Sequence, residues 1–165
     1  MAANGVAAES SSPNFFKELL VVGGGFGGMY ALHRFQKLGI PVKLVEAGSN
    51  FGGTWHHNRY PGARVDSEVP FYQLSVPEVY NTFDFTERFP DHVELRRYFH
   101  HAAEVLGLYK NAMFNTIVEG ITWSDESKEW TCRTTAGQVI TCKYLVLCTG
   151  SSYKKHLPQF KQHHN

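Results

Sequence analysis

Three glycines near the start of the chain have the spacing of a phosphate-binding turn. Gly23, Gly25 and Gly28 form the pattern GxGxxG. In such a turn the first glycine permits a tight change of direction, the second lets the backbone approach a pyrophosphate, and the third lets a helix pack close to a strand. Glu46 follows further along the sequence, at a spacing from the glycines at which a carboxylate can accept hydrogen bonds from ribose hydroxyls. An acid there favours the unphosphorylated ribose of FAD or NAD over the phosphorylated ribose of NADP.

The elements around these glycines have the order that a dinucleotide site needs. The apolar run 18–23 predicts a buried parallel strand. Residues 26–38 carry apolar side chains at helical spacing, and Gly39 ends that helix. The run 41–46 predicts a second strand with an acid at its end. Strand, glycine turn, helix and strand form the first half of a Rossmann-type fold, an order that favours a nucleotide site over a glycine-rich turn without a ligand.

The remainder of the chain predicts further elements of an α/β domain. Residues 48–90 are rich in glycine, proline and aromatic residues, and a connection of this length is usually functional. An amphipathic helix is predicted over 93–108. A continuous apolar run predicts another buried parallel strand over 144–148. The strands of a small antiparallel β-meander are predicted over 113–123, 129–135 and 139–142.

Length and composition fit one domain. The chain has 165 residues, of which 42% are hydrophobic, and this fraction argues against disorder away from the ends. We expect a Rossmann-type three-layer α/β domain over residues 16–152, with a parallel sheet and the β-meander. A flexible tail is expected over 1–15 and a polar tail over 153–165.

Charge and targeting signals exclude several classes of partner. The net charge is +1, from 16 basic and 15 acidic side chains, which argues against a nucleic-acid partner. No apolar run is long enough to cross a bilayer, and the first residues lack the basic and apolar regions of a secretory signal. The three cysteines lack metal-type spacing and are typical of reduced thiols. We therefore expect a cytoplasmic protein that binds neither nucleic acid nor membranes.

A second string of residues is more specific than the glycine motif. GGTW at 52–55 is followed by RYPGAR at 59–64, then by Asp66 and Tyr72. Together with the glycine turn, RFPDHVELRRYFHHAAEVLGL and CKYLVLCTGSSYKKHLPQF, this string resembles the N-terminal region of the Baeyer–Villiger monooxygenases and related class B flavin monooxygenases. These segments resemble those of the fungal members of the family that act in secondary metabolism. The resemblance covers nearly the whole chain and implies that residues 16–152 form an FAD-binding domain.

The resemblance implies a cofactor-binding role for particular residues. Glu46 would face the adenosine ribose, the backbone of Val118 would lie against the adenine, and the turn at 149–150 would lead into a nicotinamide-binding domain. The residues to which the resemblance gives an FAD-binding role are Gly23, Gly25, Phe26, Gly28, Glu46, Gly53, Thr54, Trp55, Arg64, Asp66, Tyr72, Val118, Thr149 and Gly150.

The flavin end of the cofactor would lie along the second string. The resemblance places Thr54 and Trp55 beside the flavin, Asp66 near the isoalloxazine ring and Tyr72 next to it. Asp66 could accept a hydrogen bond from the flavin or, if protonated in an apolar site, donate one. Arg64 and Asp66 are the best candidates for a catalytic role, because the segment between them would also approach the nicotinamide end of NADPH.

Simpler structural roles stay open for several of these residues. Arg64 and Asp66 could form a structural ion pair. The histidine pairs 56–57, 100–101 and 163–164 suggest a metal site, but neighbouring side chains on a helix or strand point apart, so we expect no metal. The aromatic residues that could simply pack in a core are Trp55, Tyr60, Phe71 and Tyr72.

Complete members of the family are longer than this chain. They carry a second GxGxxG for NADPH and the fingerprint FxGxxxHxxxW, and the present sequence contains neither. The resemblance implies FAD and NADPH as cofactors and a ketone or other small organic substrate. It predicts a truncated or split monooxygenase, with a protein partner that completes the missing domain. The alternatives are a non-redox pseudoenzyme or accessory module that keeps the FAD-domain fold, and an inactive gene fragment, so whether the chain is an enzyme stays open.

Overall fold

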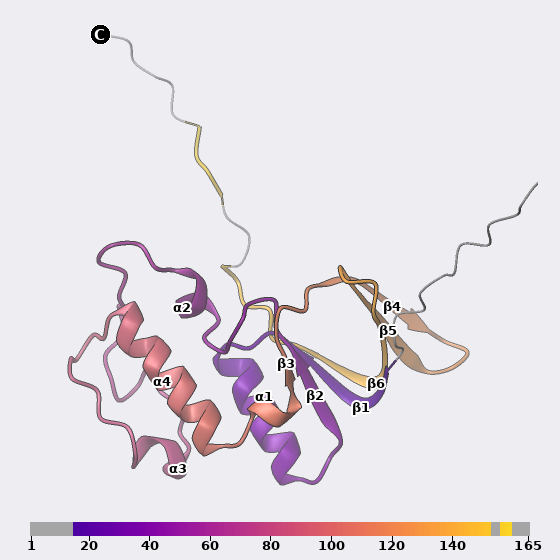
Figure 1. Cartoon of the computed structure of the whole chain (residues 1–165), viewed down its shortest axis with the longest axis horizontal. Helices are drawn as coiled ribbons and strands as arrows, with labels where there is room; N and C mark the ends of the chain where they lie inside the picture. The colour runs from indigo at the N-terminus through magenta and orange to yellow at the C-terminus, as the bar shows by residue number, and fades with distance from the viewer. Residues whose placement is uncertain (1–14, 153–155, 160–165) are drawn as a thin grey trace, which may run out of the picture.

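The computed structural model describes residues 15–152 and 156–159. One six-stranded sheet, in the order β3-β2-β1-β6-β5-β4, carries the fold (Figure 1). Most of the two tails expected from the sequence lies outside the described residues. In chain order the elements are β1 (Phe15–Val22), α1 (Phe26–Lys37), β2 (Val42–Val45), α2 (Thr54–His57), α3 (Pro77–Tyr80), α4 (His92–Val105), the 3-10 helix η1 (Tyr109–Asn111), β3 (Ala112–Met113), β4 (Val118–Ser124), β5 (Glu129–Thr134) and β6 (Val139–Leu147).

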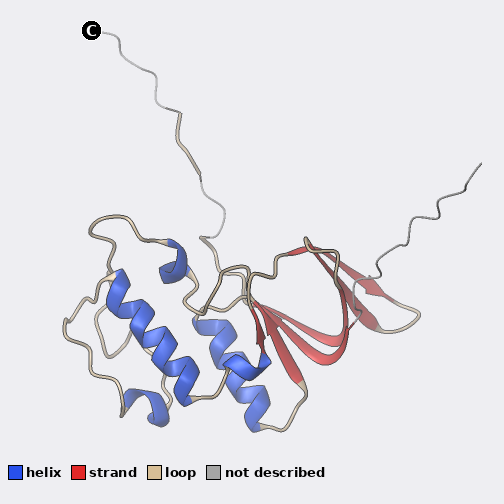
Figure 2. Ribbon diagram, viewed as in Figure 1, coloured by secondary structure: helices blue, strands red, loops and turns tan. Residues whose placement is uncertain are grey.

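The parallel half of the sheet is built around β1, which pairs in parallel with β2 on one side and β6 on the other. This central position explains why Leu20 and Val21 are fully buried. The helices lie on one side of the molecule and the strands on the other (Figure 2). Side chains of β1, α1 and α4 meet between these layers in the larger core cluster, which includes Leu19, Val21, Met29, Leu32, Leu44, Phe51, Leu95, Tyr98 and Phe99.

The opposite face of the sheet carries a smaller core cluster. Leu20 and Val45 point to this face because alternate residues of a strand lie on opposite faces of the sheet. They pack with Cys132, Ile140 and Cys142 of the β-meander. The meander consists of β4, β5 and β6, which pair in antiparallel order. Helices, parallel strands and meander confirm the predicted Rossmann-type α/β fold.

Two predicted strand boundaries are wrong. The runs 139–142 and 144–148 were predicted as separate strands, but both belong to β6, which pairs with β5 in its first half and with β1 along most of its length. The run 113–123 was predicted as one strand, but it is divided between β3 and β4. The division occurs at Asn115, whose φ of 52° is left-handed, and whose amide donates to the Gly48 carbonyl at 2.9 Å.

The long connection 48–90 contains two one-turn helices, α2 and α3, and is attached to α4. α4 begins at His92 because Asp91 caps it: the Asp91 carboxylate accepts hydrogen bonds from the amides of Val93 and Glu94 at 2.9 Å. The helix ends at Val105, before Gly107, whose φ of 61° is left-handed. The predicted helix over 93–108 is thus confirmed with a shorter C-terminal end.

The buried hydroxyl of Tyr98 holds this connection to the core. It accepts a hydrogen bond from the Leu74 amide at 2.7 Å. We expect Tyr98→Phe to lower the free energy of unfolding by about 1–3 kcal/mol, because the buried amide loses its acceptor. Burial also raises the pKa of Tyr98 to about 12. The unfolded tyrosine ionises near pH 10, so the stability that comes from burying the neutral hydroxyl is fully present below that pH and is lost as the pH rises through the window from about 10 to 12.

Urea unfolding of wild type and Tyr98→Phe between pH 8 and 12 measures both effects. The stability difference at pH 8 reports the hydrogen bond, and it should shrink above pH 10. Tyr80→Phe is the matched control, since Tyr80 is 42% exposed. A constant difference across the whole pH range would contradict the assignment of the raised pKa to this hydroxyl.

Candidate nucleotide-binding site

The glycine turn leaves no room for side chains at two positions. Gly23 follows β1 with a φ of 106°, and a Cβ there would lie 2.3 Å from the carbonyl oxygen of Cys148. A Cβ on Gly28 would lie 1.8 Å from the carbonyl oxygen of Gly23. Since backbone atoms occupy both spaces, only glycine lets α1 start this close to the ends of β1 and β6. Gly28 thus has the close packing that the motif predicts for its third glycine, and the positive φ of Gly23 fits the tight turn predicted for the first.

The N-terminus of α1 offers donors to an anion. Gly25 is its N-cap and supplies no side-chain cap, and the first hydrogen bond of the helix runs from the Met29 amide to the Gly25 carbonyl at 3.0 Å. Within the described chain, no acceptor is recorded for the amides of Gly25, Phe26 and Gly27. Free amides at the positive end of a helix dipole are the donors that phosphate groups take up in nucleotide-binding proteins.

Glu46 lies directly beside this turn. It is 6% exposed, and its Oε2 accepts a hydrogen bond from the Gly24 amide at 2.5 Å while its Oε1 accepts one from the Gly48 amide at 2.6 Å. Each carboxylate oxygen can accept a further hydrogen bond. The structure therefore places the carboxylate against the backbone of the glycine turn.

The GGTW segment packs its backbone against the glycine turn. The Gly52 amide donates to the Gly24 carbonyl at 3.0 Å. A Cβ on Gly53 would lie 2.8 Å from the Cα of Gly25, and Gly53 has a left-handed φ of 51°. The two glycine-rich loops are thus neighbours in space, and α2 starts with Thr54 at their junction. The exposed Thr54 side chain and the backbone around it lie at the same edge of the sheet as the free amides of α1.

Three aromatic side chains cluster next to this junction. Trp55 is 8% exposed, and its Nε1 donates to the Tyr72 hydroxyl at 2.9 Å. The rings of Phe26 and Tyr72 meet edge to face with centroids 5.1 Å apart. Trp55 and Tyr72 therefore have the core packing role that the sequence left open. Tyr60 and Phe71 do not, because they are 61% and 81% exposed.

The alternative that Arg64 and Asp66 form a structural ion pair is wrong. The Arg64 guanidinium instead donates to Glu87 Oε2 at 2.6 Å and to the Phe89 carbonyl at 2.7 Å, and the Glu87 contact raises the pKa of Arg64. Asp66 is exposed, and its recorded hydrogen bond is accepted from the Ser67 hydroxyl. The structure thus separates the two catalytic candidates: Arg64 is held by the segment before α4, while the Asp66 carboxylate is left toward solvent.

The other predicted residues lie at two further places. Thr149 and Gly150 follow β6 and are exposed, and the preceding Cys148 amide donates to the Val22 carbonyl at 2.8 Å. The 149–150 turn therefore starts beside the glycine turn. Val118 begins β4 and packs against the smaller core cluster, which contains Val45, the residue before Glu46.

Two residues of the site were missed from the sequence. Gly48 donates its amide to Glu46, and a Cβ on Gly48 would lie 2.6 Å from the His56 ring. His56 Nε2 accepts a hydrogen bond from the Ser49 amide at 3.3 Å, and burial lowers the pKa of His56, which favours the neutral ring that can accept. The sequence signal that could have predicted this contact is the glycine two positions after Glu46. Among the described residues, no group of three or more potential ligands is placed to hold a metal ion.

Comparisons with known proteins identify relatives of this chain. Residues 21–89 match the family model described as NAD(P)-binding Rossmann-like domain. The chain is 40% identical over 148 residues to the FAD-binding monooxygenase acrE of Aspergillus aculeatus, covering 90% of this chain and 25% of that protein. It is 40% identical over 141 residues to cyclopentanone 1,2-monooxygenase of Comamonas sp., covering 86% of this chain and 26% of that protein.

Solved structures show the same relationship. The OTEMO complex with FAD and NADP superposes with a TM-score of 0.82 at 30% identity, over 88% of this chain and 28% of that chain. The chain thus spans about a quarter of the length of the relatives it matches. In sequence and in fold, it is a relative of the Baeyer–Villiger and other FAD-binding monooxygenases and corresponds to their N-terminal Rossmann-type FAD domain.

Proposed function

We propose that this chain binds FAD as the flavin-binding part of an NADPH-dependent monooxygenase of Baeyer–Villiger type. The observation that carries the proposal is the combination of free amides at the start of α1 with a buried Glu46 carboxylate beside them. The amides of Gly25, Phe26 and Gly27 would hold the pyrophosphate. Glu46 would accept hydrogen bonds from the adenosine ribose, with the Gly24 and Gly48 amides keeping its carboxylate in place.

The loops around the site would shape the rest of the cofactor's surroundings. The backbone of 52–54 would approach FAD closely because glycines leave space there. Trp55 and Tyr72, locked together by their hydrogen bond, would form a rigid aromatic wall that limits access of water. Bound FAD would supply the redox chemistry of the family. Asp66 and the 149–150 turn are the proposed contacts toward the flavin and the nicotinamide-binding domain.

Two relatives support a proposal about the substrate and the setting. Cyclopentanone 1,2-monooxygenase is named for a small ketone, and we propose a ketone or similar small organic molecule as the substrate of the complete enzyme. The fungal relative acrE has the same percentage identity to this chain as cyclopentanone 1,2-monooxygenase. This fungal relative supports a role in secondary-metabolite biosynthesis. No helix in the described part of the chain has the length and apolar character needed to cross a membrane. Cytoplasmic location and a partner that completes the enzyme are further proposals.

Flavin titrations test the proposal directly. Purified chain, stripped of flavin, should bind FAD saturably, with quenching of flavin fluorescence. FMN should bind at least tenfold more weakly, because it lacks the second phosphate and the adenosine ribose that the glycine turn and Glu46 would recognise. NAD⁺ is the second control, since it shares the diphosphate and adenosine but not the flavin. Absence of saturable FAD binding, or equal affinity for FMN, would reject the proposal.

Addition of NADPH in air separates the enzyme from a non-redox module. FAD-loaded chain that oxidises NADPH faster than free FAD takes part in redox chemistry. FAD-loaded chain without this activity supports the accessory-module alternative, in which the fold keeps the cofactor for a partner.

A further inference from the structure

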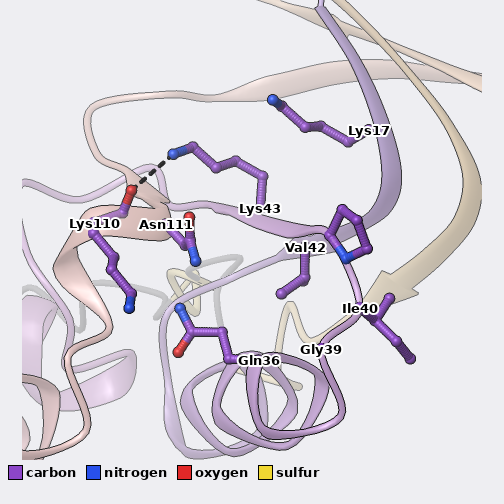
Figure 3. A pocket seen from close by; sticks show the side chains of 9 residues that line it. Lys17, Gln36, Gly39, Ile40, Val42, Lys43, Lys110 and Asn111 are labelled. Carbon is purple, nitrogen blue, oxygen red and sulfur yellow. Dashed lines mark hydrogen bonds between the residues drawn. The ribbon is translucent and has the colours of Figure 1, made fainter.

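A pocket lies at the opposite end of the strands from the glycine turn, and Figure 3 shows the side chains that line it. The glycine turn follows the C-terminal end of β1, whereas this pocket lies between the N-terminal parts of β1 and β2, the end of α1, and η1. Its volume is about 360 Å³, within the usual range of small-molecule sites. The lining residues are Lys17, Gln36, Gly39, Ile40, Pro41, Val42, Lys43, Lys110 and Asn111.

Three lysines give this pocket a positive charge. They come from three separate elements, with Lys17 on β1, Lys43 on β2 and Lys110 on η1. None of the three takes part in an ion pair recorded within residues 15–152 and 156–159, and none of the lining residues is acidic. Uncompensated like charges around a concave, partly apolar surface raise the local concentration of anions.

A hydrogen bond to the backbone of Lys110 holds the Lys43 ammonium group in place. Lys43 Nζ donates to the Lys110 carbonyl at 2.9 Å, which leaves two of its three protons for other acceptors. Burial, followed by the charge of Lys17, lowers the pKa of Lys43. The charged form of Lys43 is therefore destabilised in the empty pocket, and a bound anion would reverse that effect.

An unsatisfied amide faces the same pocket. Gln36 Nε2 is buried and has no hydrogen-bond partner among the described residues. The side-chain amides of Gln36 and Asn111 point toward one another across the pocket (Figure 3). A buried donor without an acceptor is destabilising, so such a group can mark the place of a missing partner. An anionic oxygen would satisfy it.

We propose that this pocket binds the phosphate group of a small phosphomonoester. Lysine ammonium groups and an amide donor are the groups that bind phosphate oxygens. Apolar Ile40 and Val42 beside them, and a volume larger than one phosphate, leave room for a small organic part. The site lies away from the glycine turn and Glu46 and does not depend on FAD binding.

Chemical-shift titrations of the full chain test the site. Phenyl phosphate should shift the side-chain amide signals of Gln36 and Asn111 saturably, at constant ionic strength. Inorganic phosphate should shift the same signals with weaker affinity, and chloride should not. Equal affinity for the two phosphates would overturn the organic part of the proposal. Shifts produced equally by chloride would overturn the site as a whole.

Charge-removing variants locate the binding. Lys17→Gln and Lys110→Gln should each weaken phenyl phosphate binding about tenfold. Lys128→Asn is the matched control, because it removes one positive charge from a distant turn where the φ of 56° suits asparagine. Equal weakening by the control and the pocket variants would show a general charge effect and overturn the site.

A fourth variant separates binding from folding. Gln36→Leu keeps the side-chain size but removes the buried donor, so it should weaken phenyl phosphate binding about tenfold without lowering the free energy of unfolding. Unchanged phosphate affinity in this variant would remove the amide from the proposed site. FAD affinity should stay constant in all four variants, which distinguishes this site from the candidate nucleotide-binding site at the glycine turn.

Discussion

Gly28→Ala should lower the free energy of unfolding by about 3 kcal/mol and abolish FAD binding. The added Cβ would lie 1.8 Å from the Gly23 carbonyl oxygen and 3.3 Å from Leu44 Cδ1. Only movement of α1 away from β1 and β2 relieves that overlap, because the first of these neighbours is backbone. The same movement would carry the free amides of α1 away from Glu46. Urea unfolding, followed by circular dichroism, and flavin titration measure the two effects.

The preceding residue gives a matched control for this prediction. A Cβ on Gly27 would lie 3.6 Å from Cys148 Sγ, an ordinary van der Waals contact. Alanine is also favoured over glycine inside a helix by up to about 1 kcal/mol. We therefore expect Gly27→Ala to leave the free energy of unfolding unchanged or higher. If the two alanine variants were equally stable, close packing of α1 on the glycine turn would be wrong.

Glu46→Ala has the second large expected effect, on stability and on cofactor binding together. The Gly24 and Gly48 amides would lose their acceptor in a buried place, which costs about 1–3 kcal/mol for each group. Loss of the proposed ribose contacts should weaken FAD binding roughly 100-fold. Denaturant unfolding gives the first quantity, and fluorescence titration of folded protein with FAD gives the second.

Two further variants separate the structural and the cofactor role of Glu46. Glu126→Ala removes an exposed carboxylate from the turn between β4 and β5 and should change neither quantity. Glu46→Gln keeps one acceptor oxygen, but its NH₂ group faces one of the two backbone amides. Its free energy of unfolding and its FAD affinity should therefore lie between those of wild type and Glu46→Ala. If Glu46→Ala lost stability yet bound FAD as tightly as wild type, the carboxylate would only hold the loops together.

Local signals were enough to predict the start of the fold, with its glycine turn and the acid beside it. Strand, glycine turn, helix and strand follow one another directly in the sequence. The turn can be recognised there because its backbone leaves room only for glycine at positions 23 and 28. The acid at the end of β2 follows from the same local order. A relative of known structure shares the fold over most of the chain.

Other features depended on contacts between distant residues. The strand break at Asn115 depends on the Gly48 carbonyl, and the partner of Arg64 is Glu87 rather than its neighbour Asp66. Similarly, β6 continues through Lys143 because β1 pairs with it beyond the point where β5 ends. None of these partners can be read from spacing, because the fold decides which segments meet.

The sequence by itself determined which residues can form a phosphate-binding turn, because glycine and carboxylate chemistry at fixed spacing acts through neighbouring backbone. Only the tertiary structure decided which groups serve the turn and which form other sites. It placed both Glu46 oxygens on backbone amides, and it brought Lys17, Lys43 and Lys110 from three separate elements into one pocket. The physical reason is that charges and hydrogen bonds act over a few ångströms. Which groups come within that distance of one another depends on folding and not on their positions in the chain.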